Sequence, residues 1–113
     1  MKSHQTLAKH ILECISNIEQ YTVEVTKEQF LSNFMLQDAV IRNLEIIGEA
    51  SKNISTEVRK KFPEVPWRDI LAMRNKLVHE YFGVDREAVW NVIQFDLLDL
   101  KNYALKILNF KLD

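Results

Sequence analysis

The chain has 113 residues, the length of one domain, and 47% of them are apolar, which is enough to build a core. Because glycine and proline occur only twice each, tight turns are few, and this argues against an all-β fold. The formal net charge of −1 excludes a surface that attracts nucleic acid as a whole, so any anion site has to be local. The single cysteine, Cys14, excludes an internal disulfide and a cysteine cluster for zinc.

The chain also lacks the usual marks of export or membrane insertion. The opening residues contain no uninterrupted apolar run of the kind found in signal peptides. No stretch approaches the roughly 20 apolar residues that a membrane-spanning helix needs. We therefore expect a cytoplasmic, all-α protein that forms a single domain over residues 1–113, with no membrane contact and with neither a metal ion nor a cofactor.

The first half of the chain predicts two long helical regions. The first runs over about residues 3–21, and its apolar stripe contains Leu7, Ile11, Ile15 and Ile18. Thr26 and Gln29 then form a capping box, which starts a helical region that reaches about residue 53, with a break near residue 32. We expect its buried stripe to contain Phe30, Phe34, Val40, Leu44 and Ile47.

The second half predicts one short helix and two longer ones. The short helix covers about residues 56–62 and stops before Pro63. Pro66 opens the next helix, and Gly83 marks its end. Asp85 can cap the last helix, which we expect to run to about Phe110.

The last helix has more apolar residues than one packed face requires. Such a helix is buried on several sides, and one of those sides is either a partner subunit or the interior of a monomeric bundle. We favour self-association. The apolar residues are Val89, Trp90, Val92, Ile93, Phe95, Leu97, Leu98, Leu100, Tyr103, Ile107 and Leu108.

Arg74 interrupts the apolar face of the helix in "LAMRNKLVHEYFG", residues 71–83. At about 100° per residue it falls between Tyr81 and Val78, inside the apolar arc. A guanidinium is too costly to bury unpaired, so it needs a carboxylate, a helix end, a subunit boundary or a bound anion. In a purely structural interpretation its partner is a carboxylate of the preceding helix, and the three candidates are Asp38, Glu45 and Glu49.

The functional interpretation starts from what Arg74, Asn75 and His79 can do together. A guanidinium suits phosphate, an imidazole transfers protons near neutral pH, and an amide orients either group. This combination fits RNA cleavage without a metal ion, in which the 2′-hydroxyl attacks its own phosphate. Arg74 and His79 lie about 140° apart on a straight helix, so one copy does not form a compact pocket. Two copies across a two-fold axis could supply a shared one.

The residues "RNKLVHEY" resemble the R-x4-H-x-Y motif of the HepT-like group of HEPN-domain toxins. The flanking stretches "LQDAVIRNLEIIGEASKNIS" and "FPEVPWRDILAMRNKLVHEYFGVD" are similar to this group along their whole length. The resemblance covers essentially the entire chain.

The resemblance implies an all-α, up-and-down bundle of four to five helices that forms a homodimer with the motif helices facing each other. It implies an endoribonuclease toxin whose antitoxin partner, a minimal nucleotidyltransferase of the MntA type, silences it by transferring AMP to the motif tyrosine. Arg74 and His79 match the catalytic pair, Asn75 the supporting polar residue and Tyr81 the modified tyrosine.

Two questions stay open at the level of sequence. Lys76 is adjacent to the motif residues and Arg42 and Arg68 are nearby, so all three could bind RNA phosphates. Most lysines and arginines, however, are simply solvated. The alternative function is a non-catalytic HEPN module that binds a nucleotide or the nucleotidyltransferase itself.

Overall fold

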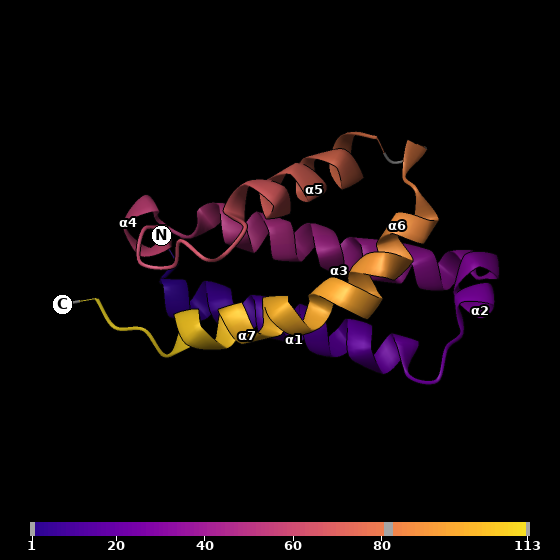
Figure 1. Ribbon diagram of the computed structural model, residues 1–113, viewed down its shortest axis with the longest axis horizontal. Coiled ribbons are helices and arrows are strands. Elements are labelled where there is room, and N and C mark those ends of the chain that lie inside the picture. The colour runs from indigo at the N-terminus through magenta and orange to yellow at the C-terminus, as the bar shows by residue number, and fades with distance from the viewer. Residues whose placement is uncertain (1, 81–82, 113) are drawn as a thin grey trace.

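In the computed structural model, which describes residues 2–80 and 83–112, every regular element is helical (Figure 1). The four long elements run alternately up and down, as expected, within a body of 48 × 28 × 23 Å. They are α1 (His4–Thr22), α3 (Phe34–Asn53), α5 (Trp67–His79) and α7 (Leu97–Leu108). Helix α1 packs against α3 and α7, and α3 also packs against α5. None of the described helices is both long enough and apolar enough to cross a membrane.

Local signals set most of the helix starts. Ser3 accepts a hydrogen bond from the backbone N–H of Thr6 and so caps α1. The predicted capping box of Thr26 and Gln29 is confirmed at the start of α2 (Lys27–Ser32). Asn33 then ends α2 and caps α3, so the predicted break lies one residue beyond Ser32.

The α4 segment (Thr56–Arg59) is shorter than the predicted helix over residues 56–62. Helix α5 begins at Trp67, so Pro66 precedes the first turn in which it was predicted to lie, and the helix ends at His79 and not near Gly83. The backbone N–H of Glu80 still closes the last turn onto the carbonyl of Lys76, although Glu80 itself no longer has α-helical backbone angles. Glycine therefore marked the connection to the next helix and not the helix end itself.

The last predicted helix is present but contains a wide turn. It comprises α6 (Arg86–Asn91), the π-helical η2 (Val92–Asp96) and α7, which ends two residues before the predicted Phe110. Asp85 caps it, as predicted, by accepting from the backbone N–H groups of Glu87 and Ala88. The N–H of Leu97 reaches back to the carbonyl of Val92, which is the hydrogen bond of a π turn.

The core lies where the four long helices meet. The predicted α1 stripe is fully confirmed, because all four of its residues are buried. In the next helical region Phe34 was wrongly placed in the core: it follows the break at Asn33 and is 75% exposed. Phe30 anchors α2 instead, since it is fully buried with its ring 5.4 Å from that of Trp90. Burying a side chain of this size contributes about 1.5–3 kcal/mol.

Most of the apolar excess on the last helix is buried within the subunit. Nine of the eleven residues are buried or partly buried, chiefly against α1 and the other long helices. Only Phe95 and Leu98 remain strongly exposed, at 75% and 68%. The sequence argument for self-association therefore depends on a much smaller surface than the composition of the helix indicated.

Candidate active site

A glycine on α3 brings the motif helix close to the rest of the bundle. A Cβ atom placed on Gly48 would lie 2.2 Å from Cβ of Arg74 and 2.7 Å from its Cγ. These separations are far inside van der Waals contact, so only glycine lets α3 and α5 approach this closely. The stem of Arg74 therefore lies directly on the backbone of α3.

The next residue of α3 holds the charged end of Arg74. Nη2 of Arg74 lies 2.7 Å from Oε2 of Glu49, and Nη1 donates to Oδ1 of Asn75 over 2.9 Å. Of the three carboxylates considered from sequence, the structure thus selects Glu49. A charged side chain is costly to bury without a partner, so the ion pair with Glu49 explains how Arg74 is tolerated on an apolar face.

Arg74 keeps unused donors after these contacts. Its Nε is buried and has no hydrogen-bond partner among the described residues. The side chain as a whole is 20% exposed, so it is held in place yet reachable from outside. Guanidinium offers five N–H donors in a planar fork, and the free ones suit an oxyanion such as phosphate.

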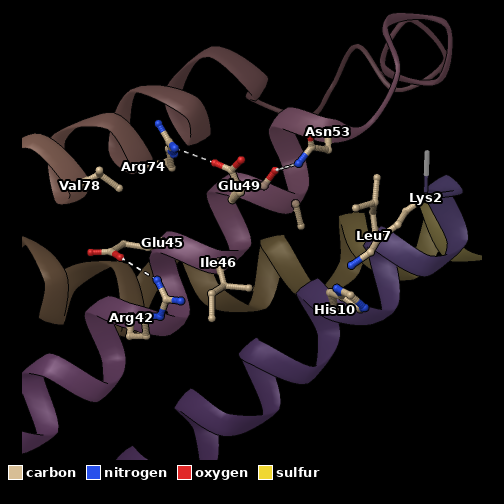
Figure 2. A pocket seen from close by; sticks show the side chains of 11 residues that line it. Lys2, Leu7, His10, Arg42, Glu45, Ile46, Glu49, Asn53, Arg74 and Val78 are labelled. Atoms are coloured by element: carbon tan, nitrogen blue, oxygen red, sulfur yellow. Dashed lines mark hydrogen bonds and ion pairs between the residues drawn. The ribbon is translucent and has the colours of Figure 1, made fainter.

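Arg74 lines a cleft of about 630 Å³ between α1, α3 and α5 (Figure 2). Three further basic side chains line the same cleft: Lys2, His10 and Arg42. The two acidic residues on its wall are Glu45 and Glu49. Lys2, Arg42 and Arg74 supply three positive charges here against the two negative charges of Glu45 and Glu49, so this cleft can attract an anion even though the whole chain is close to neutral.

Arg42 is the more exposed of the two arginines in this cleft. Its side chain is 71% exposed, and its contact with Glu45 spans 3.5 Å. An exposed ion pair of this kind contributes about 0–1 kcal/mol and is easily exchanged for another anion. Arg42 is therefore available to a ligand that enters beside Arg74.

The remaining predicted site residues that the structure describes do not line this cleft. His79 is the last residue of α5 and is exposed, but it does not line the cleft with Arg74. Lys76 and Arg68 are also exposed and lie outside it. Tyr81 lies outside the described residues.

Sequence reasoning did not find His10 and Lys2. Both belong to the start of the chain, far from the motif in sequence, and reach the cleft only because α1 packs beside α3. A lysine and a histidine on an amphipathic helix carry no local signal of a shared site. Among the described residues, no three His, Cys, Asp or Glu side chains are grouped so that they could hold a metal ion.

The family model described as ribonuclease HepT-like matches residues 11–107. This chain belongs to the HepT-like ribonuclease family. The match covers α1 from its third turn, the α3 and α5 walls of the Arg74 cleft, and all but the last residue of α7. The fold class expected from the sequence resemblance and the family membership therefore agree.

Individual relatives point the same way. The chain is 47% identical to a protein named probable ribonuclease HepT from Thermococcus cleftensis, over 94% of this chain and 96% of that one. It is 48% identical over 88% of its length to a Methanocaldococcus jannaschii protein named as a gamma-glutamylcyclotransferase and candidate RNase, of which it spans only 45%. A protein named as a candidate RNase from Caldanaerobacter subterraneus subsp. tengcongensis is 38% identical over 96% of each chain. No solved structure gives a significant match.

The close approach of α3 and α5 at Gly48 predicts that alanine at this position destabilises the protein. In an open helix, Gly→Ala stabilises by about 1 kcal/mol because alanine has the better helix propensity. In Gly48→Ala the new methyl group has to displace the stem of Arg74, so we expect the free energy of unfolding to fall by about 1–3 kcal/mol. Urea denaturation followed by circular dichroism measures this change.

The matched control is Gly83→Ala, because nothing lies within 4 Å of the position of its Cβ. We expect this variant to stay within about 0.5 kcal/mol of the wild type. A stabilised Gly48→Ala variant would show that the helices do not meet as closely as described.

Proposed function

We propose that this chain is a metal-independent endoribonuclease that acts as the toxin of a toxin–antitoxin module. The observation that carries the proposal is the state of Arg74: it is half-buried, held by Gly48 and Glu49, and still has free N–H donors on the wall of a largely basic cleft. Membership of the HepT-like ribonuclease family supports RNA as the ligand. A phosphate of the RNA backbone is the group that such a guanidinium would bind.

The proposed reaction uses the RNA's own 2′-hydroxyl as nucleophile. His79 removes the proton from this hydroxyl, and the resulting oxygen attacks the adjacent phosphorus. The bond from phosphorus to the 5′-oxygen then breaks, this oxygen takes a proton from solvent water as it leaves, and His79 returns its own proton to solvent. The products are a 2′,3′-cyclic phosphate and a 5′-hydroxyl end. Arg74 stabilises the extra negative charge on the phosphoryl oxygens, and Asn75, which is already bonded to Arg74, keeps the guanidinium in position.

The separation of Arg74 and His79 implies that two subunits share each site. His79 does not line the cleft that contains Arg74 of its own chain. A two-fold homodimer in which the α5 helices face each other would bring His79 of one subunit to Arg74 of the other. RNA would then cross the boundary between subunits, with Arg42 holding a neighbouring phosphate. Lys76 and Arg68 lie outside the cleft, so at most they would contact RNA phosphates on either side of the cleavage site.

A non-catalytic binding module is the second candidate. The ion pair between Arg74 and Glu49 favours it, because this pair already explains the presence of the arginine without any reaction. In that case the cleft would bind a nucleotide or the nucleotidyltransferase, and Arg74→Ala would weaken binding in a protein that never cleaved RNA.

Complementation between two inactive variants tests the shared site. We expect Arg74→Ala and His79→Ala to abolish cleavage separately, because the first removes the phosphate contact and the second the proton transfer. After unfolding and refolding an equal mixture, half of the dimers are mixed and each has one intact site. The mixture should therefore recover about a quarter of the wild-type rate. A fluorescent RNA oligonucleotide measures the rate.

Two controls accompany this experiment. Circular dichroism should show nearly unchanged helical content in both variants, and EDTA should leave wild-type cleavage intact. An oligonucleotide with a single 2′-deoxy substitution at the cleaved position should not be cleaved, because it lacks the attacking hydroxyl. Persistent inactivity of the mixture would contradict the shared site, and cleavage that stops with EDTA and returns with magnesium would contradict the chemistry.

Silencing would act through Tyr81, the motif tyrosine. An AMP attached to its hydroxyl would add a phosphodiester and an adenosine near the motif, and both would compete with RNA. We expect co-expression with a nucleotidyltransferase of the MntA type to add one or more AMP units at Tyr81 and to block cleavage. Tyr81→Phe should remain unmodified and active. Intact-protein mass spectrometry with peptide mapping decides this, and AMP on Tyr21 or Tyr103 alone would refute the assignment.

A further inference from the structure

The outer side of α7 carries an apolar stripe that the proposed nuclease site does not use. Leu98 and Leu105 of α7 are 68% and 40% exposed, and Phe95, which lies in the preceding η2, is 75% exposed. Asn102, which is also exposed, lies between them on the same side of the helix. We call these four residues the α7 face. Their spacing of three, four and three residues is the a/d spacing of helices that pack side by side.

The α7 face and the Arg74 cleft lie on opposite sides of the bundle. The cleft is lined by α1, α3 and α5, with no residue from α7. The view into the cleft in Figure 2 shows the yellow ribbon of α7 behind α3, and in Figure 1 α7 lies in front of α1. A dimer that places the two Arg74 clefts together therefore leaves the α7 face uncovered.

The charges beside the stripe identify its occupant. Asp99 and Lys106 are both exposed, are seven residues apart, and flank the same edge of α7. When two helices pack antiparallel about a two-fold axis, each edge faces the same edge of its copy. Asp99 would then oppose Lys106 of the other copy, twice in each pair. In a parallel pair, by contrast, Lys106 would face the opposite edge of the copy, where Lys101 lies.

The opposite edge of the stripe is already engaged within the subunit. Lys101 contacts Glu19 near the end of α1 at 3.4 Å, and His4 at the start of α1 contacts the carbonyl of Phe110 beyond the end of α7, so α1 runs antiparallel beside α7.

We propose that the α7 face binds the α7 face of a second copy of this chain in an antiparallel, two-fold pair. This contact is independent of the proposed nuclease site and goes beyond it. It places the active clefts on the outside of the pair. Together with a dimer through the cleft side, it would join subunits into assemblies larger than a dimer.

Charge exchange between Asp99 and Lys106 tests the orientation and the partner together. Asp99→Lys and Lys106→Glu each put like charges opposite each other twice, so each single variant should lower the mean mass at least twofold at micromolar concentration. The double variant restores opposite charges and should return to the wild-type mass. Light scattering after gel filtration measures the mass, relative to a chain of 13.3 kDa.

A second disrupting variant and a negative control accompany the charge exchange. Leu98→Asp should also lower the mass, and Lys52→Glu, an exposed change on α3, should not. RNA cleavage per chain should be unchanged in the α7 variants, so failure of the nuclease proposal would be seen separately. Single charge variants that keep the wild-type mass would overturn the α7 pairing, as would a double variant that does not recover.

Discussion

The contact between Arg74 and α3 is the constraint on which the site depends. Gly48 removes the side chain that would hold α5 away, and Glu49 supplies the carboxylate that makes a guanidinium tolerable at this depth. Two consecutive residues of α3 thus set both the distance between the helices and the direction of the arginine. The rest of the cleft follows from this packing, because Lys2, His10 and Arg42 line the space that α1, α3 and α5 leave between them.

The bundle presents two sides with different chemistry. The side with the cleft is polar and largely basic, whereas the outer side of α7 is apolar with a balanced pair of charges along one edge. Self-association was first inferred from the apolar excess of the last helix and from the split between Arg74 and His79, as though both described one interface. Because the two features lie on opposite sides, they are separate arguments and lead to separate contacts.

Sequence periodicity predicted the helices well because local caps and amphipathic stripes determine them. Ser3, Thr26 with Gln29, and Asp85 all act as caps, and the α1 stripe is buried throughout. Phe34 was misplaced because a helix break at Asn33 changes which face is buried. The sequence offered three carboxylates for Arg74, and only tertiary packing could select Glu49. His10 and Lys2 could not be predicted, since their place in the cleft depends on how α1 meets α3.

The central claim is that the chain keeps Arg74 for its ligand and not for its fold. The most direct test is the double variant Arg74→Met, Glu49→Gln, which removes both charges and keeps both side-chain stems. Because both charges are removed together, no buried charge is left unpaired, so the free energy of unfolding should stay within about 1 kcal/mol of the wild type while cleavage of the RNA oligonucleotide is lost. A double variant that loses several kcal/mol but still cleaves RNA would show that the pair is structural and would contradict the account.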